Sequence, residues 1–168
     1  MKILPSQEIL NENFIYNPIN GKLYNKADRN GMAMKGREAG SMRLQGYRLV
    51  SMDRVFYYVH RIIWKMVTGK DPVEELDHID HDPRNNRMEN LREVTRSENM
   101  MNASKAKNNT SGVTGVCWHK HAQKWKADIQ VEGNKIYIGL FTQRWHAIRA
   151  RKLAEVGYGF HPNHGQTA

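Results

Sequence analysis

Apolar and polar residues alternate most clearly in the C-terminal third of the chain. In KWKADIQV (124–131) one face carries the apolar side chains of Trp125, Ala127, Ile129 and Val131. The opposite face carries the polar side chains of Lys124, Lys126, Asp128 and Gln130. A period of two predicts a strand with one buried face.

Two neighbouring segments extend this pattern. KIYIGLF (135–141) repeats it, with Ile136, Ile138 and Leu140 opposite Lys135 and Tyr137, and Glu132-Gly133-Asn134 predicts the turn between the two strands. GVTGVCWHK (112–120) predicts a third strand. Thr142 is expected to cap a helix whose stripe of small residues faces the sheet, namely Ala147, Ala150 and Ala154. We therefore expect a three-stranded sheet backed by one helix, with its polar face open.

The N-terminal half mixes short helices and hairpins. A helix is predicted over 5–11 with Ser6 as N-cap, followed by strands at 14–16 and 22–24. GYRLVSM and VFYYVH predict a hairpin around Asp53-Arg54, and HRIIWKMVTG predicts a helix that ends at Gly69. The predicted fold class is α+β.

The middle of the chain combines polar chemistry with regular structure. LDHID (76–80) and LREVT (91–95) read as short strands that can pair, and Thr95 and Glu98 fit a capping box that starts a helix. This order predicts that Asn99, in that helix, returns to lie beside Asp77. The connection PRNNRMEN (83–90) is rich in side chains that bond their own backbone.

The residues brought together there suggest a hydrolytic site. The Asp77 carboxylate and the Asn99 amide would form an oxygen-only site for a hard cation such as Mg²⁺. An imidazole, whose reference pKa is about 6.5, can take a proton from water at neutral pH, and His78 stands next to Asp77. Base, cation and phosphate suffice to hydrolyse a phosphodiester. The alternative is a surface loop whose histidine makes an ordinary hydrogen bond.

Charge points to a polyanionic partner. The 168 residues include 26 Lys and Arg against 17 Asp and Glu, a formal net charge of +9. This excess favours nucleic acid ahead of an anionic membrane surface, although a merely soluble basic protein is the simpler alternative. Cys117 is the one cysteine, and His119 and His121 lack further ligands at metal spacing, so no disulfide and no zinc are expected. With no apolar run of about 20 residues, we expect no membrane partner and a cytoplasmic location.

The stretch DHID…NNRMENLREVTRSEN resembles the HNH nuclease motif, also called the ββα-metal fold, of phage homing endonucleases. The resemblance implies catalytic roles for Asp77, His78, Asn90 and Asn99. Asp77 and Asn99 would hold Mg²⁺ or Mn²⁺, His78 would be the general base, and Asn90 would brace the loop and position His78. Asn99 stands where many members of this family have histidine.

Residues 113–160 resemble the plant APETALA/ethylene-response-factor type of DNA-binding domain through SGVTGVCWHK, KWKADI and IYIGLF. In that family the polar sheet face enters the major groove. The resemblance implies DNA contacts from Thr114, Cys117, His119, Lys126, Asp128, Gln130, Lys135 and Tyr137. Arginines of the N-terminal part are predicted to contact phosphates, namely Arg43, Arg48 and Arg61, although a solvated face explains them equally well.

The predicted domains are a nuclease domain at 1–101, a basic linker at 102–112, a sheet-plus-helix domain at 113–160 and a tail at 161–168. The predicted function is that of a metal-dependent, site-directed endonuclease on double-stranded DNA, a homing-type nickase acting as a monomer in the cytoplasm of a bacterial host. A non-catalytic DNA-binding regulator and a restriction-type enzyme that cuts both strands remain alternatives.

Overall fold

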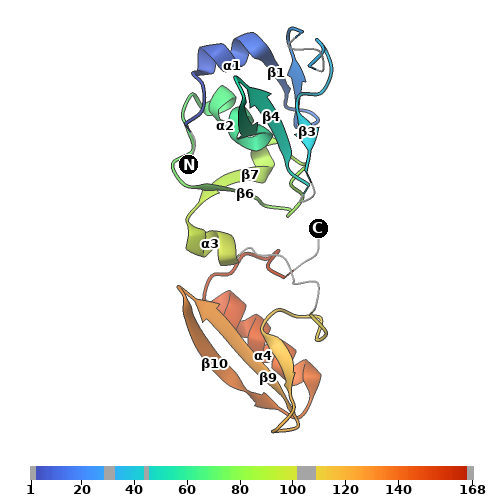
Figure 1. Ribbon diagram of the computed structural model, residues 1–168. Coiled ribbons are helices and arrows are strands. Elements are labelled where there is room, and N and C mark those ends of the chain that lie inside the picture. Colours follow the sequence, from blue (N-terminus) through green and yellow to red (C-terminus); the bar gives the residue numbers. More distant parts are fainter. Residues whose placement is uncertain (1–2, 29–32, 44–45, 102–108, 166–168) are drawn as a thin grey trace. The chain divides into compact units, whose positions relative to one another are not determined.

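The computed structural model describes residues 3–28, 33–43, 46–101 and 109–165. The chain divides into two compact units, a first unit from Met1 to Val94 and a second unit from Thr95 to Ala168. Both combine helices with small antiparallel sheets (Figure 1), so the α+β class is confirmed. No helix in the described ranges is long and apolar enough to cross a bilayer.

The first unit opens with a capped helix and a hairpin. Helix α1 (Gln7–Asn13) begins after Ser6, whose hydroxyl accepts a hydrogen bond from the Ile9 amide at 3.4 Å. Strands β1 (Phe14–Asn17) and β2 (Lys22–Asn25) follow and pair antiparallel, with Tyr16 opposite Leu23. The predicted helix, cap and hairpin are confirmed.

A three-stranded sheet and a second helix come next. Strands β3 (Ser41–Met42), β4 (Arg48–Met52) and β5 (Val55–Tyr58) lie in that order, and Asp53 and Arg54 turn β4 into β5 with positive φ angles of 47° and 65°. Helix α2 (Val59–Thr68) ends at Gly69, whose φ is 76°. The strand predicted to run through His60 stops at Tyr58, so Val59 and His60 belong to the helix.

The core of the first unit lies among α1, α2 and the hairpins. Its fully buried side chains come from elements distant in sequence, and they include Leu10, Phe14, Leu23, Val50, Val59, Ile62 and Ile63. Burying a side chain of this size contributes about 1.5–3 kcal/mol. In the same unit β6 (Glu75–His78) pairs antiparallel with β7 (Leu91–Val94), as predicted, and a 3₁₀ turn, η1 (Met88–Asn90), leads into β7.

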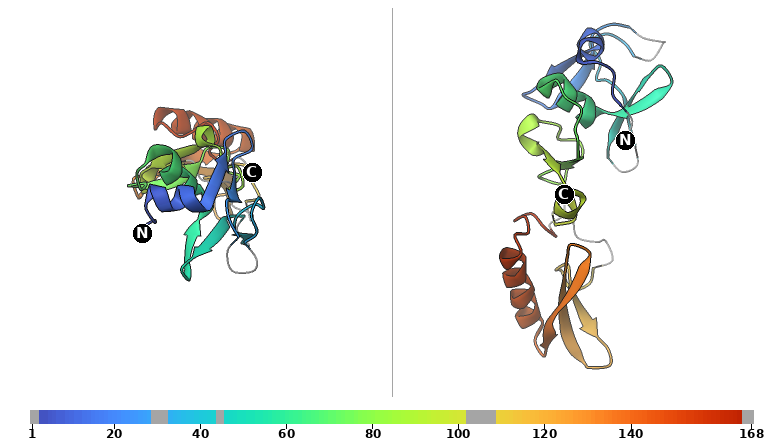
Figure 2. Two further views of the ribbon diagram at one scale, coloured as in Figure 1. Left: turned by 90° about the horizontal axis from the view of Figure 1, so that it is seen from above. Right: turned by 90° about the vertical axis from the view of Figure 1, so that its left-hand side faces the viewer.

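The second unit begins with the predicted capping box. The Glu98 carboxylate accepts a bond from the Thr95 amide at 2.8 Å, and the Thr95 hydroxyl accepts one from the Glu98 amide at 3.2 Å. These reciprocal bonds start helix α3 (Arg96–Met101). Strands β8 (Val116–His119), β9 (Lys124–Val131) and β10 (Asn134–Phe141) form a sheet in the order β10-β9-β8, and α4 (Arg144–Gly157) covers one face of it (Figure 2).

Two details of this sheet and helix differ from the prediction. A β-bulge between Tyr137 and Gly139 inserts one residue, so Leu140 pairs with Lys126 on the polar face while Phe141 turns toward the helix. Gln143 rather than Thr142 is the N-cap of α4, without a side-chain bond. Trp118 is 44% exposed and meets Trp125 edge to face at 5.4 Å, and of the two only Trp125 packs against the core.

The predicted linker and tail are described only in part. Residues 102–108 of the linker and 166–168 of the tail lie outside the described residues. Asn109 bonds the Val113 carbonyl and the Gly112 amide, so the end of the predicted linker is a structured turn. His164 is 4% exposed and packs against Arg151 of α4, so the described part of the tail belongs to the folded second unit.

Candidate active site

The pairing of β6 with β7 places Asp77 and His78 at the end of a strand. In the register Asp77 lies opposite Arg92 and His78 opposite Leu91. The exposed fractions of Asp77 and His78 are 9% and 4%, well below what a solvated loop would give. Buried polar groups need partners, and both of these side chains have them.

Arg92 is the partner of Asp77. Its Nε and Nη2 atoms both donate to Oδ2 of Asp77, at 3.1 and 2.9 Å. Asp77 is therefore a buried carboxylate that already has a cation beside it. A divalent ion bound there would share this carboxylate with the guanidinium or displace it.

Asn86 is the partner of His78. The Nε2 atom of His78 lies 2.9 Å from Oδ1 of Asn86, and both side chains are buried. This contact was not predicted. Four asparagines stand in this stretch of sequence, and their spacing does not indicate which one reaches the imidazole.

Aromatic rings enclose the His78 imidazole within the first unit. The centre of the Tyr47 ring lies 5.9 Å from the centre of the His78 ring, and the centre of the His60 ring lies 5.3 Å from it; both contacts are edge-on. Tyr58 stacks on His60 at 5.3 Å. Burial, with a smaller contribution from His78, lowers the pKa of His60 to about 3, and burial raises the pKa of Tyr47. Both side chains are therefore neutral at physiological pH. His60 and Tyr47 were not predicted as site residues.

Asn90 makes three hydrogen bonds to the loop that follows His78. Its Oδ1 accepts a bond from the Asp80 amide at 3.1 Å, and its Nδ2 donates to Oδ1 of Asp80 and to the carbonyl of Asn85. Burial opposes ionisation of Asp80, but bonds from Asn85, the Asp82 amide and Asn90 outweigh it and lower the Asp80 pKa. The side chain that contacts Nε2 of the His78 ring is that of Asn86.

Asn99 lies in α3 of the second unit, where its amide donates to the Thr95 carbonyl at 2.9 Å. Its predicted place beside Asp77 stays a prediction. No group of three or more His, Cys, Asp or Glu side chains that could hold a metal occurs in the described ranges. The proposed donors, one carboxylate and one amide oxygen, still fit a hard cation that keeps several waters.

The polar face of the β8–β10 sheet carries most of the predicted DNA contacts. Lys126 and Lys135 both pair with Asp128, at 2.8 and 3.3 Å, and the hydrogen bond that Lys126 donates to Asp128 raises the pKa of Lys126. Gln130 and Tyr137 are exposed. Cys117 is also exposed and lies opposite Lys126 in the register.

Two of the residues predicted to contact DNA are partly buried in the second unit. The Thr114 hydroxyl oxygen is buried, which does not suit a contact with DNA. His119 is partly buried, and its Nδ1 accepts a bond from the Ala122 amide at 3.1 Å.

The three predicted arginines of the first unit differ in accessibility. Arg43 is exposed, with its guanidinium 5.4 Å from the centre of the Phe56 ring. Arg48 pairs with Glu38 at 3.1 Å and donates to the Gly40 carbonyl at 2.6 Å. Burial lowers the pKa of Arg61, which nonetheless remains cationic. Arg43 is thus the one of these three whose charge is most open to solvent.

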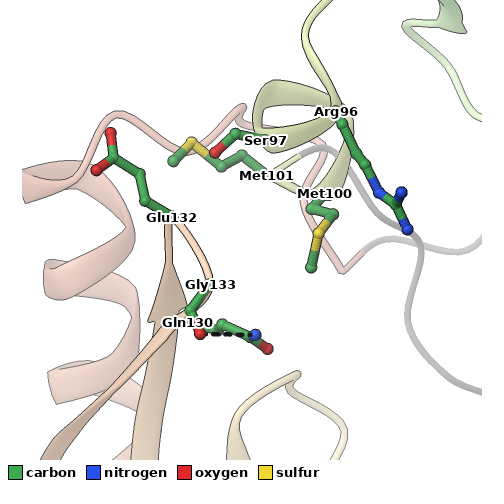
Figure 3. A pocket seen from close by; sticks show the side chains of 7 residues that line it. All are labelled: Arg96, Ser97, Met100, Met101, Gln130, Glu132 and Gly133. Carbon is green, nitrogen blue, oxygen red and sulfur yellow. Dashed lines mark hydrogen bonds between the residues drawn. The ribbon is translucent and has the colours of Figure 1, made fainter.

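A pocket of about 200 Å³ lies in the second unit between α3 and the turn joining β9 to β10 (Figure 3). It is lined by Arg96, Ser97, Met100, Met101, Gln130, Glu132 and Gly133. The predicted catalytic residues are not among these, so the pocket is not the candidate active site.

Comparison with known proteins finds a family model and a phage relative. Residues 57–101, which include Asp77, His78, Asn90 and Asn99, match the family model described as HNH endonuclease. Protein 3.8 of Escherichia phage T7 is 34% identical over 98 residues, which are 58% of this chain and 73% of that protein. No solved structure matches the chain. The chain belongs to the HNH endonuclease family.

Proposed function

We propose that this protein is a divalent-metal-dependent endonuclease that nicks double-stranded DNA at a chosen site, in the manner of a homing enzyme. One observation carries the proposal. Asp77 and His78 are consecutive, buried and individually oriented, by Arg92 and Asn86, within the segment that matches the HNH endonuclease family. A non-catalytic protein that kept only the fold would not need an imidazole held in one orientation.

His78 would act as the general base. In its neutral form it would take a proton from the water that attacks the phosphorus, while the bond from phosphorus to the leaving oxygen breaks. Solvent would then protonate the leaving oxygen. General-base catalysis of this kind contributes roughly 10²–10⁴-fold to a rate.

Asp77 and Asn99 would hold the cation. When bound, Mg²⁺ or Mn²⁺ supplies positive charge that stabilises the charge developing on the scissile phosphate. Asn99 is separated from the end of β7 by four residues, 95–98, and three of these begin α3. We assign Asn99 to the cation because it lies, with Asp77, in the segment that matches the HNH endonuclease family.

The second unit would bind the DNA. Its sheet presents Lys126, Gln130, Lys135 and Tyr137 on the face opposite α4, which supports the proposed likeness to the APETALA/ethylene-response-factor domain. This group of four has no arginine, so bidentate contacts to guanine would be absent from it. We propose that the protein binds DNA as a monomer in the cytoplasm of a bacterial host.

A non-catalytic DNA-binding regulator is the second candidate. The observation that favours it is the engagement of Asp77 by Arg92, since this cation occupies one oxygen of the proposed metal ligand. A restriction-type enzyme would share the chemistry of the nickase and differ in cutting both strands.

The form of the DNA product separates these three candidates. Supercoiled DNA that carries a candidate target site is incubated with the protein, with Mg²⁺ or with EDTA, and the products are resolved on a gel. A nickase converts supercoiled DNA to open circles only with Mg²⁺, and mapping of the ends gives the target. Linear DNA would indicate the restriction-type enzyme, and unchanged supercoiled DNA that is nonetheless bound would indicate the regulator.

A further inference from the structure

The contact between His78 and Asn86 decides which nitrogen of the imidazole carries the proton. Both side chains are almost completely buried, with exposed fractions of 4% and 5%. The Nδ2 group of Asn86 donates to the Arg84 carbonyl at 3.4 Å, which turns Oδ1 toward the histidine. An amide oxygen only accepts hydrogen bonds, so Nε2 of His78 must be the protonated nitrogen.

The consequence concerns the other ring nitrogen. In a neutral imidazole one nitrogen carries the proton and the other the lone pair. With the proton on Nε2, the lone pair of His78 is on Nδ1. The nitrogen that could act as a base is therefore set by Asn86.

Asn86 is itself held by the first hairpin of the chain. The Tyr16 hydroxyl of β1 donates to the Asn86 carbonyl at 3.2 Å and accepts a bond from the Met88 amide at 3.3 Å. A Cβ atom at Gly21 would lie 2.8 Å from the Arg87 nitrogen and 3.0 Å from the Asn86 carbonyl carbon. The tip of the β1–β2 hairpin therefore packs directly on the backbone that carries Asn86.

The His78 ring is also confined on other sides. The edge-on contacts with Tyr47 and His60, at 5.9 and 5.3 Å, restrict rotation of the imidazole out of its contact with Asn86. The loop next to it is fixed by the bonds of Asn90. Ring orientation and proton position thus follow from packing that involves no metal and no DNA.

We propose that Asn86 is a positioning residue for His78: it keeps the imidazole in the tautomer protonated on Nε2, with the β1–β2 hairpin holding Asn86 in place through Tyr16. This proposal adds a residue to the nuclease reaction proposed above and rests on it for the catalytic role of His78. The tautomer itself does not depend on nuclease activity.

The direct test is NMR of the whole chain with ¹⁵N-labelled histidine, at a pH near 8.5 where an ordinary imidazole, with a pKa of about 6.5, is neutral. The ring nitrogens of His78 are expected to show the tautomer protonated on Nε2. Asn86→Ala should shift the populations toward a mixture, and Asn86→Asp, which keeps an acceptor oxygen, should restore the original tautomer. Asn85→Ala is the matched control in the same loop, and it should leave the His78 tautomer unchanged.

Tyr16→Phe keeps the ring and removes only the hydroxyl, so it should partly shift the His78 tautomer in a chain that still folds. If Asn86→Ala disturbs the fold, seen as a loss of dispersed amide signals, this variant provides the result. A wild-type His78 protonated mainly on Nδ1 would overturn the proposal, as would an unchanged tautomer in a folded Asn86→Ala or Tyr16→Phe variant.

Activity gives a second, separate result. Asn86→Ala should lower kcat by roughly 10²-fold, the range of general-base catalysis, and change KM less than threefold, with partial recovery in Asn86→Asp. A tautomer that behaves as expected in a protein without nuclease activity would contradict the proposed function alone. An Asn86→Ala variant with the wild-type kcat would contradict the positioning role.

Discussion

Arg92 and Asp77 face each other across the β6–β7 pair, and two nitrogens of the guanidinium bond one oxygen of the carboxylate at 2.9 and 3.1 Å. The arginine thus stabilises a buried negative charge at the position proposed to bind a divalent cation. It would also compete with that cation. Metal affinity should therefore be low until DNA phosphate adds further oxygen ligands.

Replacing Arg92 should expose this competition. We expect Arg92→Met to raise the affinity for Mn²⁺ in the absence of DNA by roughly 3- to 10-fold, which corresponds to about 1 kcal/mol for a partly exposed ion pair. Electron paramagnetic resonance of free Mn²⁺ measures this directly. Arg84→Met removes the same charge from an exposed position and serves as the control. Equal affinities in the two variants would contradict competition at Asp77.

The pKa of His60 makes the stability of the first unit depend on pH. Folding lowers the pKa of His60 from 6.5 to about 3. Between these two pH values His60 is protonated in the unfolded chain and neutral in the folded one. The folded state therefore loses stability as the pH falls below about 6.5. Between pH 6.5 and 5 the loss should be about 2 kcal/mol. His60→Phe keeps an aromatic ring and should remove this loss.

Urea unfolding at pH 7.5 and 5, followed by the methyl NMR signals of Ile62 and Ile63, measures the first unit by itself. These two residues are fully buried in α2, within one helical turn of His60. The exposed His121 of the second unit provides a control variant, His121→Phe, with unchanged pH dependence. An equal loss of stability in wild type and His60→Phe would show that another group titrates.

Lys126 and Lys135 should contribute to DNA affinity through phosphate contacts. Each contact lowers the slope of log K against log salt concentration by about 0.9, so the double variant Lys126→Gln, Lys135→Gln should have a slope shallower by up to about 1.8. Fluorescence anisotropy with a labelled duplex over a series of NaCl concentrations measures it. Lys22→Gln and Lys70→Gln in the first unit form the matched pair. If both pairs change the slope equally, the sheet face is not the binding surface.

Gly115 is required by close packing in the second unit. Its φ is 77°, and a Cβ atom there would lie 2.3 Å from the Asp128 carbonyl oxygen and 2.5 Å from Nε of Arg151. Gly115→Ala should destabilise the second unit by about 3 kcal/mol or more, whereas Gly133→Ala, with a φ of 82° and open space around it, should cost only about 1 kcal/mol. Thermal unfolding of both variants checks this. Equal losses of stability in the two variants would mean that the positive φ angle, and not close packing, causes the whole effect at Gly115.

Local sequence signals predicted much of the secondary structure because they act over a few residues. The Asp53-Arg54 and Glu132-Gly133 turns, the Ser6 cap and the Thr95–Glu98 capping box are each satisfied by neighbours in the chain. The bulge near Ile138 was missed because it depends on how β10 pairs with β9 and packs on α4. Leu140 consequently lies on the polar face, although the alternation of apolar and polar residues had placed it on the apolar face.

The sequence predicted only the residues of the candidate site that belong to the motif, namely Asp77, His78 and Asn90. The roles of Asn86, His60 and Tyr47 depend on contacts between segments that are far apart or irregular, and no periodicity encodes these contacts. His60 lies in the first turn of α2 and not in the predicted strand, and from there its ring contacts that of His78.

The proposed identity of the base is tested most directly by single-turnover cleavage of target DNA by His78→Ala. His81→Asn is the matched control, since His81 stands in the same loop with a φ of 65° that asparagine tolerates. We predict a loss of at least about 10²-fold in the cleavage rate of His78→Ala, with DNA affinity within about threefold of wild type and with His81→Asn close to wild type in both. Cleavage by His78→Ala at the wild-type rate would contradict the account.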